Sequence, residues 1–330
     1  SIPPSVTEIG YNAFSGCSSL TSITIPPLVT EIGGYVFEDC SSLSSVTMPN
    51  VTEIGSSAFY SCSSLKKINA SSTYDAVINL NTIPSNAFYS NSFETLELGA
   101  NVTNINGDSF SNNSSLKKIH IIGNSSTNIN GAFNSCISLE EVVIDNASSI
   151  NTNTFNSSNT IKKVTIGNYS SIDNGLFQGK TSLTSLTLSN AVTSIGNQAF
   201  SGCTSLTNVE LPNALTSIGA SAFTNCSSMT TLIIPDSVVS IGNQAFSGCS
   251  GLNSILIGRS TPPTIGTNVF ASSNCLIYVP QASYDLYVNA ENWSTYRDRI
   301  FATGTDYKAM LIGGTTKIIE CNGNTTLAQS

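Results

Sequence analysis

The chain has 330 residues, of which 40% are hydrophobic and only 10% are charged, and its formal net charge is −8. This apolar fraction is high enough for a continuous core, which argues against a disordered chain. With only 12 Lys and Arg residues, the chain lacks the clustered basic residues that nucleic-acid phosphates require. No apolar run approaches the roughly 18 residues of a membrane-spanning helix, so we expect no direct membrane insertion.

A phenylalanine recurs along most of the chain at a nearly constant period. Successive members lie 22 to 24 residues apart, except for one interval of 29 residues. A fixed period of this length is typical of solenoids, in which each unit buries its apolar side chains only by stacking on the next. We predict about twelve coils of 22–23 residues over residues 1–280, marked by Phe14, Phe37, Phe59, Phe88, Phe110, Phe133, Phe155, Phe177, Phe200, Phe223, Phe246 and Phe270.

Each coil is predicted to contain a short strand with one buried face. Leu20, Ile23 and Ile25 form an L-x-x-I-x-I pattern, and its alternating end is typical of a half-buried strand. Pro26 follows and closes the strand, because proline has no N–H to donate to a ladder. The chain begins at Ser1 in the middle of such a unit. We therefore expect a longer parent protein, with any export signal upstream.

A turn is predicted after the isoleucine that precedes each repeat phenylalanine. Glycine, asparagine and aspartate occupy the next position in nearly every coil, and all three tolerate a positive φ angle. Pro84 holds this position in one coil and cannot adopt that conformation. We therefore predict a left-handed turn everywhere except before Phe88, at Gly10, Gly33, Gly55, Asn106, Asn130, Asn151, Asp173, Gly196, Gly219, Gly242 and Gly266.

The 29-residue interval predicts an inserted loop at about residues 71–81, next to the middle coils, which carry unusual charge. Loops on a rigid scaffold often bind ligands, so we take this region as the candidate binding surface. Drift in a degenerate repeat would look similar, and the sequence leaves both interpretations open. An exposed apolar patch is also predicted at two adjacent outward positions further along. The candidates are Lys67, Tyr74, Asp75, Glu97, Lys118, His120, Glu141 and Lys163 in the first region, and Ile233 and Leu256 in the patch.

Seven cysteines lie three residues after a repeat phenylalanine and predict a ladder of buried, reduced thiols. Asn113, Ser158 and Lys180 hold this position in degenerate coils. No C-x-x-C pair suggests zinc, so we expect no metal site. Cys275 and Cys321 lie outside the ladder; they are the thiols we expect to be accessible, and a disulfide between them is left open. The ladder cysteines are Cys17, Cys40, Cys62, Cys136, Cys203, Cys226 and Cys249.

No pattern in the sequence indicates catalysis. His120 is the only histidine and lies between Ile119 and Ile121 on a predicted strand, so it should point outward. A Ser-His-Asp arrangement needs a buried, oriented histidine. The chain also lacks an Asp-x-Asp calcium loop and a glycine-rich phosphate loop. We therefore expect no enzyme and no cofactor.

The C-terminal part departs from the repeat. Residues 281–301 predict a helical cap, because the polar stretch from Ser283 to Arg299 carries four aromatic residues that can cover the open end of the core. Residues 302–330 predict a tail with a β-hairpin, in which 310–312 and 317–319 flank the turn Gly313-Gly314.

The unit I-P-x-x-V-T-x-I-G-x-x-A-F-x-x-C-x-S-L-T-x-I is nearly intact at residues 192–209, 215–232 and 238–255. It resembles the BspA-like class of leucine-rich repeats over about residues 1–301. The ending Ile277-Tyr278-Val279-Pro280, followed by Trp293 and Tyr296, looks like the terminal cap of this class. The resemblance implies a right-handed, β-rich leucine-rich-repeat solenoid with a C-terminal cap and no shared catalytic residues.

The resemblance also implies a place on the surface of gut or oral bacteria or of parasitic protists, and a role in adhesion. We therefore expect a non-enzymatic binding scaffold of a secreted or cell-surface protein, monomeric, with a protein or glycan ligand on a host or neighbouring cell. The alternative is a structural stalk that presents another domain.

Overall fold

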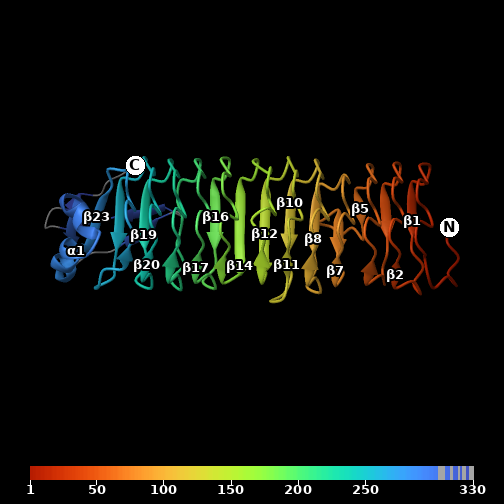
Figure 1. Ribbon diagram of the computed structural model, residues 1–330, viewed down its shortest axis with the longest axis horizontal. Helices are drawn as coiled ribbons and strands as arrows, with labels where there is room; N and C mark the ends of the chain where they lie inside the picture. The colour runs from red at the N-terminus through yellow and green to blue at the C-terminus, as the bar shows by residue number, and fades with distance from the viewer. Residues whose placement is uncertain (304–308, 313–314, 319, 322–324, 327–330) are drawn as a thin grey trace. The chain divides into compact units, whose positions relative to one another are not determined.

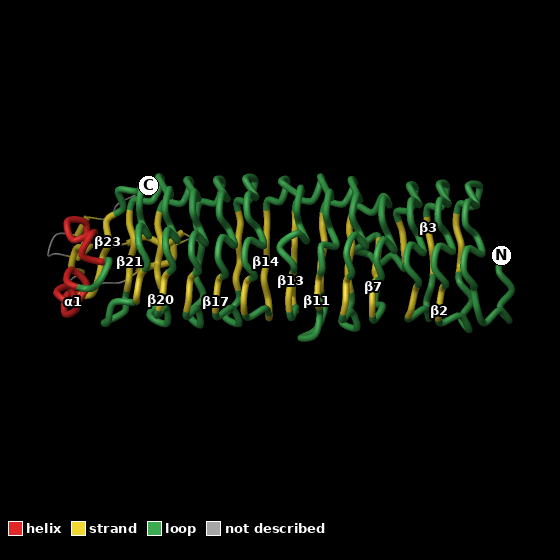
Figure 2. The backbone as a smooth tube through the Cα atoms, viewed as in Figure 1, coloured by secondary structure: helices red, strands yellow, loops and turns green. Residues whose placement is uncertain are grey.

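The computed structural model describes the backbone of residues 1–303, 309–312, 315–318, 320–321 and 325–326, and the side chains of residues 1–303. The fold is a β-solenoid of parallel strands with about 12 turns spaced about 23 residues apart (Figure 1), which confirms the predicted fold class. Most of each coil is turn rather than strand (Figure 2). The chain divides into two compact units, Ser1–Tyr169 and Ser170–Ser330, here called unit 1 and unit 2.

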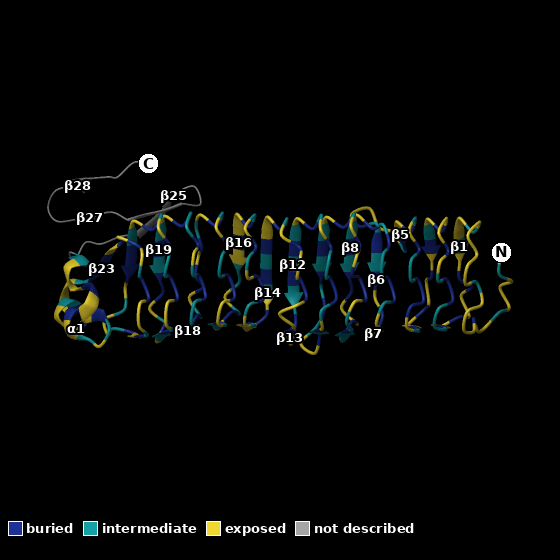
Figure 3. Cartoon of the chain, turned by 45° about the horizontal axis from the view of Figure 1, so that its top comes forward, coloured by how far each residue is buried: buried dark blue, intermediate teal, exposed yellow. Residues whose placement is uncertain are grey.

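Unit 1 has a sheet of parallel strands on one side of the coils and two-residue strands on the other. The first sheet holds, in order, β1 (Ser22–Thr24), β3 (Ser45–Thr47), β5 (Lys67–Ile68), β6 (Ala76–Ile78), β8 (Thr95–Leu98), β10 (Lys118–Ile121), β12 (Glu141–Asn146) and β14 (Lys163–Asn168). The short strands are β2 (Glu31–Ile32), β4 (Glu53–Ile54), β7 (Thr82–Ile83), β9 (Asn104–Ile105), β11 (Asn128–Ile129) and β13 (Ser149–Ile150). Buried residues alternate with partly exposed ones along the longer strands, so one face of this sheet meets solvent (Figure 3).

Unit 2 repeats this plan. Its short strands β15 (Ser171–Ile172), β17 (Ser194–Ile195), β18 (Ser217–Ile218), β20 (Ser240–Ile241) and β22 (Thr264–Ile265) form one parallel sheet. On the other side lie β16 (Ser185–Leu188), β19 (Thr231–Ile234), β21 (Ser254–Ile257), β23 (Leu276–Pro280) and β24 (Ile300–Thr303), of which the last four form a sheet. β24 spans the predicted boundary between the cap, 281–301, and the tail, 302–330.

The repeat phenylalanines form the predicted core stack within each unit. Neighbouring rings are nearly parallel, with centroids 5.1 Å apart for Phe37 and Phe59 and 5.4 Å apart for Phe223 and Phe246. From Phe37 onward every repeat phenylalanine is fully buried. Phe14 is only partly buried and stacks on Phe37.

The left-handed turn is not where we predicted it. None of the glycines after the repeat isoleucine has a positive φ. Left-handed residues instead occur two positions before and two positions after the repeat phenylalanine, as at Tyr35 (φ 57°) and Asp39 (φ 56°) around Phe37. The two turns form an arch that points the ring inward. The arch is also hydrogen-bonded to the next coil, because Phe37 N donates to Ala58 O at 2.8 Å.

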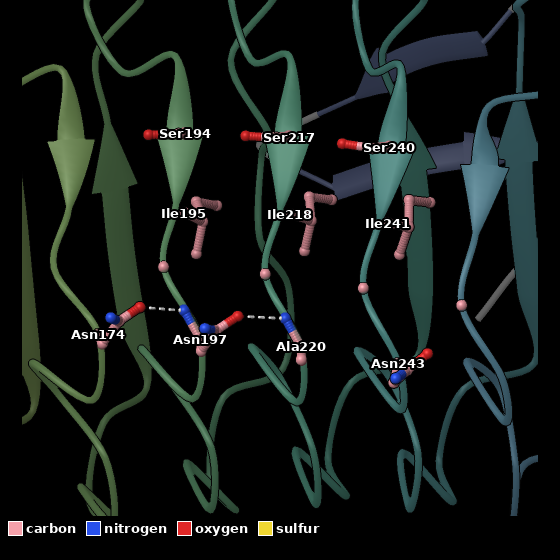
Figure 4. Close-up of a pocket in the computed structure, with 14 residues that line it drawn as sticks. Asn174, Ser194, Ile195, Asn197, Ser217, Ile218, Ala220, Ser240, Ile241 and Asn243 are labelled. Carbon is pink, nitrogen blue, oxygen red and sulfur yellow. Dashed lines mark hydrogen bonds between the residues drawn. The ribbon is translucent and has the colours of Figure 1, made fainter.

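Glycine follows the isoleucine because the backbones of neighbouring coils approach closely there. A Cβ atom on Gly219 would lie 2.6 Å from Asn197 N, and one on Gly242 would lie 2.4 Å from Ala220 N. In unit 2 these glycines line a shallow groove, in which Asn197 Oδ1 accepts a 2.7 Å hydrogen bond from Ala220 N (Figure 4). In the coils that carry glycine here, the position therefore requires small size and not a positive φ; the coils with Asn106, Asn130, Asn151, Asp173 or Pro84 accommodate a side chain.

Pro84 also corrects our expectation. Because the position that it occupies does not need a positive φ, proline fits, and the following turn is built as in other coils. Asn86 supplies the left-handed residue (φ 58°), and Ala87 N donates to Pro84 O at 3.2 Å.

The insertion at 71–81 is not a loop, as we had predicted, but adds a strand to the sheet. β6 lies between β5 and β8, with Ala76 paired to Ile68 on one side and to Leu96 on the other. Ala76 and Ile78 are fully buried. The apolar alternation of these residues places them in the core, and the segment is part of the scaffold.

The cysteine ladder is buried from Cys40 onward, as predicted, but Cys17 is exposed, because it lies in the first coil beside the partly open Phe14. Cys275 is also a free thiol and is buried, contrary to our expectation of an accessible group. Ser273 Oγ donates to Cys275 Sγ at 3.3 Å. The side chain of Cys321, its candidate disulfide partner, lies outside the described residues.

The C-terminal segment is helical only in short pieces. These are the 3-10 helices η1 (Gln281–Ser283) and η2 (Trp293–Arg299), and α1 (Tyr284–Asn289) between them. Trp293 and Tyr296 pack on Phe270, the last ring of the stack, and Trp293 Nε1 donates to Pro263 O at 2.8 Å. Among the described residues, no helix is long and apolar enough to cross a membrane.

Four short strands are described in the tail. β25 (Ala309–Ile312) pairs antiparallel with β26 (Thr315–Ile318), and β27 (Glu320–Cys321) pairs with β28 (Thr325–Thr326). The turn that we predicted at Gly313-Gly314 and the end of the second arm at Ile319 lie outside the described residues.

Candidate binding surface

The solvent-facing side of the sheet in unit 1 brings most of the predicted site residues together. Strand register places Lys118 between Thr95 and Glu141, and places Lys163 on the other side of Glu141. His120 is paired in register with Glu97. We call the outward side chains of β8, β10, β12 and β14, together with Tyr74 and Asp75, the central strip.

Glu141 is shared by two lysines. Its carboxylate lies 3.0 Å from Lys163 Nζ and 3.4 Å from Lys118 Nζ. Partial burial opposes ionisation of Glu141, but the two ammonium groups outweigh it and lower the pKa of this carboxyl below its usual range. Glu141 therefore stays charged and holds both lysines in place across three neighbouring coils.

His120 bridges two carboxylates from different coils. Its Nε2 lies 2.7 Å from Asp145 Oδ2, and its Nδ1 lies 3.4 Å from Glu97 Oε2. Which nitrogen carries the proton depends on the tautomer. Our sequence reasoning missed Asp145. It follows Ile144 in the same period-2 alternation that placed Glu141 and Val143 on the outward face, and that alternation could have identified it.

Tyr74 joins the insertion to the strip. Its ring centroid lies 5.9 Å from that of His120 and 5.7 Å from Lys118 Nζ, which places the ammonium over the ring. Tyr74 is largely buried, and burial raises the pKa of its hydroxyl, so the phenol stays neutral. The ring forms a floor beneath Lys118 and His120.

Asp75 fastens the insertion to β8. Thr95 Oγ1 accepts a hydrogen bond of 2.9 Å from Asp75 N and donates one of 3.1 Å to Asp75 Oδ2.

Lys67 is the one predicted residue of this region that lies away from the central strip. It is exposed on β5, and β6 separates that strand from β8.

A second row of charges runs beside the strip, one residue earlier in each coil, and our sequence reasoning did not single it out. Lys117 Nζ lies 2.8 Å from Glu94 Oε2, and Lys162 Nζ lies 2.8 Å from Glu140 Oε1. The pKa of the Glu94 carboxyl is lowered and that of Lys117 is raised by their mutual hydrogen bond and charge. The repeated Lys-Lys dipeptides, with the single Glu-Glu dipeptide at 140–141 in the coil between two of them, were the signal for this row.

Comparison with protein families gives one decisive match. The model described as the BspA type leucine-rich repeat region, six copies, matches residues 1–80, 81–181 and 170–283. The chain belongs to this family.

Solved structures similar to this BspA type repeat protein come from bacteria. A leucine-rich repeat protein from Bacteroides ovatus is 26% identical, covers 78% of this chain and 86% of its own, and has a TM-score of 0.48. One from Eubacterium ventriosum is 23% identical, with coverages of 81% and 68% and a TM-score of 0.45. A leucine rich cell surface protein from Faecalibacterium prausnitzii is 22% identical, with coverages of 87% and 88% and a TM-score of 0.33. None of the curated proteins compared matches the chain.

The apolar patch predicted in the later BspA type coils is not exposed. Leu256 is paired in register with Ile233 on one side and Tyr278 on the other, and it is buried. Ile233 is only partly exposed. A buried Leu256 offers no exposed apolar surface to a ligand, and the patch is withdrawn as a candidate site.

No group of three or more His, Cys, Asp and Glu side chains within the described residues is arranged to hold a metal ion. His120 illustrates the reason, because its two carboxylate partners approach opposite nitrogens of the ring and do not converge on one point. The strip holds a set of ion-paired charges and one aromatic ring.

Proposed function

We propose that this BspA type chain is a non-enzymatic binding scaffold outside the cell, and that the central strip contacts a protein or glycan on a host or neighbouring cell. One observation carries the proposal. Lys118 and His120 on β10 contact Tyr74 of the insertion, Glu97 of β8 and Glu141 of β12 on the solvent-facing side of a single sheet. The location outside the cell follows what the family resemblance implies.

The strip is suited to binding because its side chains are held before a ligand arrives. Lys118 is fixed by Glu141 and Tyr74, and His120 by Asp145 and Tyr74. Side chains held in this way lose little conformational entropy on association. Exposed ion pairs contribute little to folding stability, so the concentration of charge in these coils is better accounted for by a ligand than by the stability of the solenoid.

The coils of unit 2 favour the alternative of a stalk for their own part of the chain. Ser194, Ser217 and Ser240 stand in register along one sheet, a plain polar surface with no cross-coil charge. A regular surface of this kind suits a spacer. Unit 2 can therefore serve as a support while unit 1 carries the contact face.

The test is a double variant, Lys118→Ala with His120→Ala, compared with Thr47→Ala on the same sheet face outside the strip. Binding of the full chain to host cells and matrix proteins is measured by a plate assay with labelled protein. We expect the double variant to lose about tenfold or more in affinity, as for residues at the centre of an interface, and the control to bind normally. Equal binding by the unchanged chain, the double variant and the Thr47→Ala control would contradict the proposal, provided that circular dichroism shows the same fold for all three.

A further inference from the structure

The outward face of the last sheet in unit 2 carries large apolar side chains where the sheet of unit 1 is polar. The corresponding outward positions of β8, β10 and β14 hold Glu97, His120 and Thr165. In unit 2, strand register places four apolar residues side by side, one from each of β19, β21, β23 and β24. We call them the apolar row: Ile233, Leu256, Tyr278 and Phe301.

The middle of the apolar row is hidden from solvent. Leu256 is only 2% exposed and Tyr278 only 9% exposed, whereas Phe301 on the neighbouring strand is 44% exposed. The ring of Phe301 packs against that of Tyr278, with centroids 6.0 Å apart, but Phe301 lies two strands away from Leu256. Whatever covers the row is therefore centred on β21 and β23.

The neighbours of Leu256 in the sheet do not account for its burial. Val143 holds the same outward position on β12, between two strands in register, and it remains partly exposed. Along the chain, Ser254 and Gly258 stand two residues before and after Leu256, and both are small. A further apolar segment is needed to exclude water from this side chain.

The tail of the same chain contains a segment that needs such a surface. β25 and β26 pair antiparallel as a two-stranded hairpin. An isolated hairpin of two strands is at best marginally stable in water, and it becomes stable when it packs against apolar surface. All four residues of β25, Ala309–Ile312, are apolar. The hairpin and the apolar row thus each need an apolar partner.

The link between the row and the hairpin is short. Phe301 belongs to β24, which ends at Thr303, and β25 begins at Ala309. The six Cα–Cα steps between these two ends span at most about 20 Å, and β21 lies two strands from β24, which corresponds to about 10 Å. The hairpin can therefore reach β21 and β23, and the short tether gives it a high effective concentration there.

We propose that the hairpin of β25 and β26 packs against the apolar row and covers β21 and β23 within the same chain. The contact stabilises the hairpin, which has no core of its own, and it removes an apolar sheet face from solvent. The last coils of unit 2 then present no apolar surface to a partner. This inference goes beyond the proposed function and does not depend on the ligand of the central strip.

The first experiment measures how fast trypsin cleaves the folded full chain after Lys308 and Lys317, with mass spectrometry as the readout. A packed hairpin must open before it is cut, so the rate follows the population of the open form. We expect cleavage to be slower by about tenfold or more than in a synthetic peptide of residues 304–330. Leu256→Asp should raise the rate in the full chain by about tenfold, because it places a charge beneath the hairpin. Thr187→Asp, at an exposed outward position of β16, is the matched control and should leave the rate unchanged.

The second experiment changes the tail instead, because a charge at Leu256 also loosens the sheet itself. Met310→Asp with Leu311→Asp charges two successive positions of β25 and therefore both faces of that strand. We expect this variant to bind the dye 8-anilinonaphthalene-1-sulfonate with several-fold stronger fluorescence than the unchanged chain, since the apolar row becomes exposed. Thr325→Asp with Thr326→Asp in β28 is the control and should not increase the fluorescence.

The inference is overturned if the tail of the unchanged chain is cut as fast as the peptide, or if Leu256→Asp and Thr187→Asp are cut at equal rates. Unchanged dye fluorescence in the β25 variant would also overturn it. A second copy of the chain on the apolar row would give a dimer in sedimentation that Leu256→Asp dissociates, and this result would replace the hairpin as the occupant. Circular dichroism checks that each variant keeps the fold.

Discussion

Cys62 Sγ donates a hydrogen bond of 3.0 Å to the carbonyl oxygen of Phe37 in the preceding coil. The same bond recurs up the ladder, as from Cys203 Sγ to Phe177 O at 3.3 Å. The repeat cysteine is therefore more than a small apolar residue. It gives a second hydrogen bond to a buried carbonyl, since Phe37 O also accepts one from Cys40 N at 3.2 Å within its own coil.

Asn113 shows that the donor is what the position requires. Its Nδ2 reaches Phe88 O at 2.9 Å and Phe110 O at 2.7 Å, and its Oδ1 accepts a bond from Asn91 N at 3.0 Å. We predict that Asn113→Ala lowers the free energy of unfolding by about 1–3 kcal/mol, because it leaves buried groups unpaired. Asn113→Cys restores one donor and should cost clearly less. Urea unfolding of both variants provides the measurement, and equal losses would contradict the role of the hydrogen bond.

We expect the cysteine of the first coil to react faster with thiol reagents than the ladder cysteines of the later coils. Cys17 is exposed, while Cys136 and Cys203 are buried and burial raises the pKa of each to about 12. Because the thiolate is the reactive form, we predict that iodoacetamide modifies Cys17 of the native chain quickly and the buried ladder only on unfolding. Peptide mass spectrometry after a short exposure identifies the modified sites. Fast modification of Cys203 in the folded chain would show that the ladder is open to solvent.

The same burial makes the fold sensitive to alkaline pH. The pKa of the Cys203 and Cys249 thiols is raised from 9.0 to about 12, mainly by desolvation. A raised folded-state pKa means that the unfolded chain loses these protons first, so the stabilisation is complete below about pH 9 and is lost as the pH rises towards 12. We predict a steeper fall of the unfolding free energy over this range for the unchanged chain than for Cys249→Ser. Parallel slopes would show that the thiols do not contribute.

The repeat phenylalanines show why the fold could be predicted. Their period alone defined the coils, because a side chain that must stack on its neighbour has to recur in register. The insertion could not be placed in the same way. Its extra length suggested a loop, but Ala76, Ile78 and Leu80 alternate as in a strand and are buried. The length of the interval between repeat phenylalanines shows that residues were added. Only the alternation of apolar residues within it indicates where they pack.

The central strip was predictable for residues on regular strands and less so elsewhere. His120, Glu97 and Glu141 followed from the alternation of β10, β8 and β12. The contact of Tyr74 with His120 depends on how β6 enters the sheet, which no local pattern states. Leu256 was misplaced because outward direction was equated with exposure, although it is buried on the outward side of its strand.

The glycine after each repeat isoleucine provides the most direct test of how the coils pack. A methyl group on Gly219 would come within 2.6 Å of backbone atoms of the preceding coil, at Asn197 N and Gly196 C, whereas one on Gly107 would meet only Asn130 O, at 3.4 Å. Neither glycine has a positive φ. We predict that Gly219→Ala destabilises the chain by about 1–3 kcal/mol, as for overpacked positions, and that Gly107→Ala is close to neutral or slightly stabilising, because it restricts the unfolded chain. If close approach were not the reason for glycine, Gly219→Ala would be no more destabilising than Gly107→Ala. Thermal or urea unfolding of the two alanine variants therefore tests whether close approach of the coils is the reason for glycine at this position.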